Sequence, residues 1–215
     1  MTPGQTLSDI TAKVLKGLEK VIAEAKPDIV LVHGDTTTTF AGALAAFYSR
    51  TALGHVEAGL RTHQKYSPYP EEVNRQFVGC IADLHFAPTE LSRENLLREG
   101  KNPDSIIVTG NTAIDAMQTT VRENFDDDIL RWAGDSRLIV LTAHRRENLG
   151  EPMRGMFRAI KRITDEHADI KVVYPVHLNP VVRQAADDIL GNTDRIRLIE
   201  PLDVIEFHNL LSRSY

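Results

Sequence analysis

The chain has 215 residues, 42% of them hydrophobic, and a formal net charge of −5. This composition excludes disorder and, because basic blocks are absent, argues against a nucleic-acid surface. The first twenty residues lack the apolar core of a signal peptide, and no apolar run approaches a membrane span, so we expect a cytoplasmic protein with no membrane partner. The single cysteine, Cys80, excludes an intrachain disulfide, and its helical context favours a buried structural thiol.

Helical patterns and short apolar runs alternate along the whole chain. This alternation predicts an α/β fold with parallel sheets and crossover helices, in two domains over residues 1–112 and 113–215. Because the pattern begins at a helix and stops where a new strand is due, we expect each sheet to be incomplete and the chain to be a fragment. The predicted elements are, in order, helix 6–25, strand 28–33, helix 37–49, strand 52–56, helix 71–82, strand 84–87, helix 90–99, strand 105–109, helix 112–123, strand 137–141, helix 151–166, strand 170–175, helix 180–190, strand 195–199 and helix 204–212.

Three carboxylates follow the first strands. Asp35 lies in HGDTTTT, Glu57 lies in HVEAGLR, and Glu71 opens a helix in PYPEEVNR. Because loops at the carboxyl ends of parallel strands share one crevice, we expect these side chains to converge. Asn74 and Arg75, one helical turn later, are expected to face the same end and to orient a carboxylate. Convergent carboxylates indicate proton-transfer chemistry.

Each carboxylate also has a purely structural interpretation. Asp35 or a following threonine can cap the next helix. Glu57 can form a salt bridge with Arg61, and a carboxylate at position 71 or 72 can stabilise the helix N-terminus. The small residues Ala58 and Gly59 would let a ligand approach the backbone beside Glu57.

The basic segment His144-Arg145-Arg146 follows an apolar strand, and one imidazole with two guanidinium groups suits a diphosphate leaving group. His177 occupies the equivalent strand end one unit later, where it can instead cap a helix. The histidines expected in core or supporting positions are His33, His55 and His85. Neither HExxH spacing nor a GxGxxG or GxxxxGK motif occurs, so we expect no metal, nicotinamide or P-loop site.

Several longer motifs carry a resemblance to a known family. The segments HGDTTTTFAGALAAFY, GHVEAGLRT, YSPYPEEVNRQ, VTGNTAIDA, TAHRRENLGEP, PVHLNP and IEPLD together resemble the non-hydrolysing bacterial UDP-N-acetylglucosamine 2-epimerases. The resemblance implies a GT-B-like fold, in which two Rossmann-like domains flank a cleft. It also implies interconversion of UDP-N-acetylglucosamine and UDP-N-acetylmannosamine for cell-surface polysaccharide, without an added cofactor, by a homodimer.

The resemblance also implies residue roles. Asp35, Glu57 and Glu71 match the family's acids and bases, and His144 matches a histidine near the diphosphate. Leu202 and Phe207 match positions that contact uracil. A weaker match, formed by Gln5, Glu71 and His177, is a second site through which substrate activates many members. The family's route eliminates UDP to give 2-acetamidoglucal and then adds UDP back on the other face.

Two motifs of the family are missing from the sequence. The GTRPE strand would precede Met1 and the SGGVQEE loop would follow Tyr215, so we expect the chain alone to be inactive. Three alternatives stay open for the intact protein. They are a hydrolysing epimerase that releases N-acetylmannosamine, a GT-B glycosyltransferase, and a non-catalytic nucleotide-sugar sensor.

Overall fold

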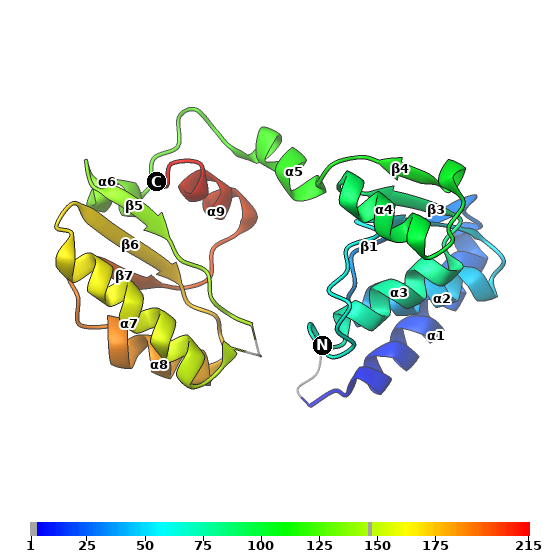
Figure 1. Ribbon diagram of the computed structural model, residues 1–215, viewed down its shortest axis with the longest axis horizontal. Coiled ribbons are helices and arrows are strands. Elements are labelled where there is room, and N and C mark those ends of the chain that lie inside the picture. Colours follow the sequence, from blue (N-terminus) through cyan, green and yellow to red (C-terminus); the bar gives the residue numbers. More distant parts are fainter. Residues whose placement is uncertain (1–3, 146–147) are drawn as a thin grey trace. The chain divides into compact units, whose positions relative to one another are not determined.

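The structure, a computed structural model, describes residues 4–145 and 148–215 (Figure 1). Contacts divide the chain into two compact units, Met1–Ile114 (unit 1) and Asp115–Tyr215 (unit 2). Each unit holds one parallel sheet with crossover helices, so the predicted α/β class is confirmed. Within the described ranges, no helix combines the length and the apolar character that crossing a bilayer would require.

Unit 1 contains a four-stranded parallel sheet in the order β1-β2-β3-β4. The 3₁₀ helix Pro103–Ser105 leads into its last strand, and α5 crosses the boundary between the units. The elements are α1 (Leu7–Ala25), β1 (Ile29–His33), α2 (Thr37–Tyr48), β2 (Ala52–Val56), α3 (Glu71–Ile81), β3 (Leu84–Ala87), α4 (Glu90–Arg98), β4 (Ile106–Val108) and α5 (Thr112–Thr120).

One face of the unit 1 sheet packs against α2 and α3. Val32 and Leu53 point to this side and form a core cluster with Ala43 and Ala46 of α2 and Val78 of α3. The small alanines let α2 lie close to the strands. On the opposite face of β1, Ile29 and Leu31 are 38% and 60% exposed. In the part of the chain that the structure describes, this face is therefore open at β1.

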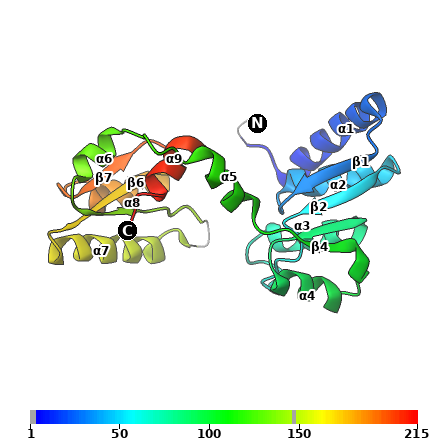
Figure 2. The same cartoon turned by 90° about the horizontal axis from the view of Figure 1, so that it is seen from above.

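Unit 2 contains a three-stranded parallel sheet in the order β5-β6-β7 (Figure 1). Figure 2 labels two of these strands, β6 and β7, together with the helices α7 and α8. Its elements are α6 (Asp128–Ala133), β5 (Arg137–Val140), α7 (Glu151–Glu166), β6 (Ile170–Pro175), α8 (Pro180–Leu190), β7 (Ile196–Ile199) and α9 (Val204–Leu211). Successive residues of the buried strand β6 point to opposite faces. Val172 and Tyr174 join the cluster with α7 and α8, whereas Val173 joins the cluster with α6 and α9.

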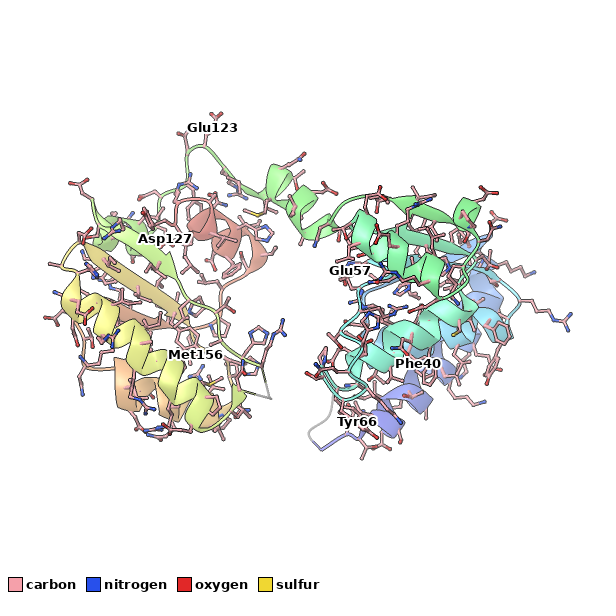
Figure 3. All side chains as sticks on the ribbon, viewed as in Figure 1. Phe40, Glu57, Tyr66, Glu123, Asp127 and Met156 are labelled. Carbon is pink, nitrogen blue, oxygen red and sulfur yellow. The ribbon has the colours of Figure 1, made fainter. Side chains whose placement is uncertain are left out.

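Two expectations differ from the structure. The helix α6 is not among the predicted elements, because the acidic segment at its start has an irregular pattern. Asp127, labelled in Figure 3, caps the helix by accepting a hydrogen bond from the Ile129 amide. Ile129 and Ala133 are the buried residues of this helix. The interpretation of Cys80 as a buried thiol is wrong, since Cys80 is exposed. Val78 and Gly79 take the inward positions of α3, which leaves position 80 on the outer side.

Candidate active site

Asp35 and Glu57 meet at the guanidinium group of Arg75. Arg75 Nη2 lies 2.5 Å from Asp35 Oδ2 and 3.1 Å from Glu57 Oε2. Arg75 Nη1 also donates to the Glu57 carbonyl oxygen. Because one nitrogen binds both side chains, the two carboxylates lie within about two hydrogen-bond lengths of each other. Glu57 is labelled in Figure 3.

The sheet register explains why these two carboxylates converge. His33 at the end of β1 is the partner of Val56 at the end of β2, so Asp35 and Glu57 leave adjacent strand ends. Gly34 turns the chain at φ +74°, and its amide donates to the Val56 carbonyl at 3.0 Å. Of the two α3 residues expected to orient a carboxylate, Arg75 does so, whereas Asn74 Nδ2 donates to the Asp35 backbone carbonyl at 2.9 Å.

Glu57 has a left-handed backbone conformation, with φ +64°. For a residue with a side chain this conformation costs about 1–2 kcal/mol. Strain of this kind persists where the surroundings enforce it, and it concentrates at functional sites. Here the buried Arg75 donates to the Glu57 carbonyl, so a contact within the cluster accompanies the strained conformation.

The three charged groups differ in their access to solvent. The Arg75 side chain is 7% exposed, whereas those of Asp35 and Glu57 are each 26% exposed. The cation is therefore more deeply buried than the two anions, which are partly accessible to solvent. This arrangement offers proton acceptors to a ligand and fixes their positions from behind.

Glu71 is the first residue of α3 and is partly exposed. Residues four apart lie on the same side of a helix, so Glu71 is on the side of Arg75. Among the described residues, no hydrogen bond or ion pair joins Glu71 to Asp35 or Glu57. The third predicted carboxylate therefore lies at the same end of the sheet but outside the ion-pair cluster.

Glu72, which sequence reasoning treated only as a helix-end charge, anchors the loop before α3. Its carboxylate accepts from the amide and hydroxyl of Thr62, the amide of His63 and the amide group of Gln76. Burial opposes ionisation, but these hydrogen bonds outweigh it and lower the pKa of Glu72. The sequence shows two consecutive glutamates at the start of a helix, which does not tell which of them is buried.

His55 and His85 are buried, as predicted, but His33 is exposed and its Nε2 lies 3.2 Å from Thr112 Oγ1. Burial lowers the pKa of His55 to about 4, although its hydrogen bond to the Gly34 carbonyl opposes this effect. Burial also lowers the pKa of His85. The expectation of a core position is therefore wrong for His33.

The structure supports one structural alternative and contradicts another. Thr36, the threonine that follows Asp35, caps α2 by accepting from the Thr39 amide, as one alternative expected. Glu57 does not pair with Arg61, because Arg61 Nε binds Glu99 at 2.7 Å.

The interpretation of Ala58 and Gly59 as a ligand approach is also wrong. Ala58 is fully buried in a cluster with α4. A methyl group on Gly59 would lie 2.2 Å from the carbonyl oxygen of Ser92 in α4. The small residues are therefore needed by the helix that packs on this loop.

In unit 2 the two strand-end histidines contact each other. His144 follows β5, His177 follows β6, and their rings stack with centroids 5.9 Å apart. His177 Nδ1 accepts from the Asn179 amide at 3.1 Å, so a role at the start of α8 and a role beside His144 coexist. Tyr174, missed from the sequence, steadies this edge by donating to the Ala143 carbonyl at 2.6 Å. Burial raises the pKa of Tyr174 to about 12, so the hydroxyl keeps its proton.

The other predicted ligand contacts are distributed over both units. Arg145 is exposed directly after His144, and Arg146 lies outside the described residues. Leu202 follows β7 and packs against the cluster under α9, and Phe207 lies on α9. Gln5, which precedes α1, belongs to unit 1 with Glu71, whereas His177 belongs to unit 2.

Within residues 4–145 and 148–215, no group of three or more His, Cys, Asp or Glu side chains is arranged to hold a metal ion. The chemistry that the described side chains themselves offer is acid–base chemistry in unit 1. Unit 2 offers imidazole and guanidinium groups that suit an anion.

Comparisons with known proteins agree on one family. The sequence model of the UDP-N-acetylglucosamine 2-epimerase family matches residues 1–215. UDP-N-acetylglucosamine 2-epimerase of Bacillus subtilis is 62% identical over 215 residues, which are 100% of this chain and 57% of that protein. The chain therefore spans little more than half the length of this relative.

Solved structures give the same result. A structure of S. aureus MnaA with UDP has a TM-score of 0.95 and 57% identity, covering 100% of this chain and 60% of that one. The UDP-GlcNAc 2-epimerase from Neisseria meningitidis bound to UDP-GlcNAc has a TM-score of 0.92 and 43% identity, with coverage of 100% and 60%. The match of the family model to the whole sequence, together with this fold and these identities, shows that the chain belongs to the UDP-N-acetylglucosamine 2-epimerase family.

Proposed function

We propose that a protein containing this chain interconverts UDP-N-acetylglucosamine and UDP-N-acetylmannosamine by the non-hydrolysing route. The observation that carries the proposal is the placement of Asp35 and Glu57 on one buried guanidinium group at the carboxyl edge of the sheet. The relative from Neisseria meningitidis, whose structure holds UDP-GlcNAc, supports the choice of substrate.

Inversion at C2 requires the exchange of a proton that no neighbouring carbonyl group acidifies. Direct removal of this proton is therefore slow, and elimination offers a route with a lower barrier. In the elimination a carboxylate takes the C2 proton, the C1–O bond to UDP breaks, and a C1–C2 double bond forms in 2-acetamidoglucal. In the second half, a proton is delivered to the other face of C2 and UDP oxygen bonds to C1.

Two acidic groups suit this cycle, because one face of the sugar must lose a proton and the other must gain one. We assign these proton transfers to Asp35 and Glu57, with Glu71 as the third acidic group of the same edge. Arg75 would keep the carboxylates in position while their protonation states change.

We assign binding of UDP to unit 2. His144 and Arg145 would contact the diphosphate, which leaves with additional negative charge and is stabilised by cations. Leu202 and Phe207 would contact the uracil ring. Gln5, Glu71 and His177 are the proposed second substrate site, and the intact enzyme is proposed to be a homodimer that supplies cell-surface polysaccharide synthesis.

The test is incubation of the purified protein with UDP-N-acetylglucosamine in heavy water. The expected result, measured by proton NMR, is the incorporation of deuterium at C2 of both UDP-sugars without net release of UDP. The 215-residue chain alone, assayed in parallel, is expected to give no turnover; robust turnover would show that further segments are dispensable.

Other outcomes identify the competing functions. Accumulation of UDP with free N-acetylmannosamine would indicate the hydrolysing reaction. Transfer of the sugar to an acceptor with protium retained at C2 would indicate a glycosyltransferase. Binding without exchange would indicate a sensor, and any of these results would contradict the proposal.

A further inference from the structure

His55 is a buried titratable group that the proposed chemistry does not use. It is the fourth of the five residues of β2 and is fully buried. Its register partners are Val32 on β1 and His85 on β3, so its side chain points toward the same face as theirs. This is the face that α2 and α3 cover.

The contact that His55 makes fixes its protonation. His55 Nε2 lies 2.8 Å from the Gly34 carbonyl oxygen. A carbonyl group only accepts, so Nε2 carries the proton and donates it. His55 Nδ1 is buried and has no hydrogen-bond partner within the described part of the chain. Because an imidazolium ion at this position would leave a charged N–H group unpaired, the ring stays neutral.

The acceptor of this hydrogen bond belongs to the turn that carries Asp35. Gly34 lies so close to Glu57 that a methyl group on its Cα would be 3.3 Å from Glu57 Oε2. His55 holds the Gly34 carbonyl, and Asn74 holds the Asp35 carbonyl at 2.9 Å. Two consecutive peptide groups of the turn are thus held by two side-chain donors.

We propose that His55 is a positioning residue whose neutral imidazole, as a fixed Nε2–H donor to Gly34, sets the Gly34–Asp35 turn against Glu57. The inference rests on the proposed function, in which Asp35 and Glu57 transfer protons. Without this donor the Gly34 carbonyl has no other hydrogen-bond partner among the described residues, and the peptide group can rotate. Asp35 then moves away from the geometry that it shares with Glu57 on Arg75.

His85 provides a matched control. It is 1% exposed, it lies beside His55 on the next strand, and its Nδ1 is also buried without a partner among the described residues. In the same described ranges, no hydrogen bond joins His85 to the Gly34–Asp35 turn. Replacement of either histidine by leucine removes a buried imidazole, but only the change at position 55 removes the donor.

The kinetic experiment compares His55→Leu, His55→Gln and His85→Leu in an active enzyme that contains this segment. We expect His55→Leu to lower kcat about tenfold to a hundredfold with KM within about twofold, since small displacements of catalytic groups have effects of this size. His55→Gln, whose side-chain N–H₂ can reach Gly34, should recover most of the loss. His85→Leu should leave kcat within about threefold at an equal folded fraction. Equal losses in His55→Leu and His85→Leu, or no recovery with glutamine, would overturn the proposal.

A second experiment does not depend on catalysis. Nitrogen-15 NMR of the histidine rings in the 215-residue chain should show His55 as the neutral Nε2–H tautomer between pH 5 and pH 8. A protonated ring or the Nδ1–H tautomer in that range would overturn the proposal. If the enzyme exchanged no C2 proton but His55 showed this tautomer, the proposed function would fail and the placement of the turn by His55 would stand.

Discussion

Arg75 Nη2 lies 2.5 Å from Asp35 Oδ2, although the two residues are forty positions apart in the sequence. The same nitrogen lies 3.1 Å from Glu57 Oε2. A guanidinium group can serve two carboxylates and a carbonyl at once because its donors are arranged in a planar fork, which an ammonium group lacks.

The first prediction concerns this fork. Arg75→Lys should lower kcat by about a hundredfold, because a single ammonium group cannot hold Asp35, Glu57 and the Glu57 carbonyl together. Steady-state kinetics of an active enzyme containing this segment measure the effect. Arg98→Lys, at a side chain that is 65% exposed and pairs with Glu94, is the control. A kcat for Arg75→Lys within threefold of this control would contradict the role of the fork.

The second prediction concerns Gly59. In Gly59→Ala the added methyl group would clash with the Ser92 carbonyl oxygen, and the backbone of residue 59, at φ +86°, would also be strained. We therefore expect the unfolding free energy of unit 1 to fall by about 3 kcal/mol or more. Gly100→Ala, at φ +77° with no atom within 4 Å of the added carbon, should cost only about 1 kcal/mol of backbone strain. Equal losses in both variants would show that the α4 contact is not tight.

Because the chain has two units, the stability of unit 1 needs its own probe. The single tryptophan, Trp132, lies in unit 2, so its fluorescence reports unit 2 alone. Hydrogen exchange of the β2 amides reports unit 1. With these probes Gly59→Ala should change β2 exchange and leave the Trp132 transition unchanged.

The third prediction is an acid sensitivity confined to unit 1. Burial lowers the pKa of His55 from 6.5 to about 4, so in this range the unfolded chain binds a proton that the folded chain does not. The unfolding free energy of unit 1 should therefore fall as pH decreases from about 6.5 to about 4, by about 3 kcal/mol for His55. The lowered pKa of Glu72 adds a further loss below its ordinary value of 4.5.

This acid effect is measured by hydrogen exchange of β2 amides between pH 7 and pH 4.5, corrected for intrinsic exchange. His55→Gln removes one titrating ring and should reduce the dependence, leaving the part that comes from His85 and Glu72. In unit 2, the described carboxylates with shifted pKa values, Asp169, Asp188 and Glu200, lie at the surface, so the Trp132 transition should depend less on pH. A parallel loss in both units would contradict the assignment.

The fourth prediction concerns the loop that Glu72 anchors. In Glu72→Gln one carboxylate oxygen becomes an N–H₂ group that faces donors, so hydrogen bonds to Thr62 or His63 are lost. Trypsin should then cleave after the exposed Lys65 about tenfold faster, since cleavage follows the population of the opened loop. Glu71→Gln, one position away and partly exposed, should not change the cleavage rate. An unchanged rate in Glu72→Gln would show that the loop is held by other contacts.

Much of the fold could be predicted from the sequence, because continuous β-branched runs and helical spacing alternate without ambiguity. Strand β6 and helices α7 and α8 have the predicted ends, and Asn179 caps α8 where the Asn-Pro pair indicated. The helix α6 could not be predicted, since three consecutive aspartates stand at its start and only Ile129 and Ala133 are buried, which is too few residues for a helical pattern.

Prediction was less complete for the site. The sequence order of strands and loops was enough to bring Asp35 and Glu57 to one edge, and helical spacing was enough to place Arg75 there. The partner of Arg61 could not be predicted, because Glu99 lies on an element thirty-eight residues away. Nor could the roles of His55 and Glu72, because each depends on which carbonyl or amide a buried side chain meets.

The close approach of Gly59 to α4 has a consequence for how mutations in this family should be interpreted. Asn95 of α4 donates to the Gly59 carbonyl at 3.0 Å, and the backbone of Ser92, also in α4, packs directly against Gly59. The loop begins at Glu57, so a substitution that shifts α4 would displace a carboxylate to which we assign proton transfer, without touching it. A random mutagenesis screen for lost turnover would therefore score positions on α4 as essential, although α4 contributes no side chain to the cluster of Asp35, Glu57 and Arg75.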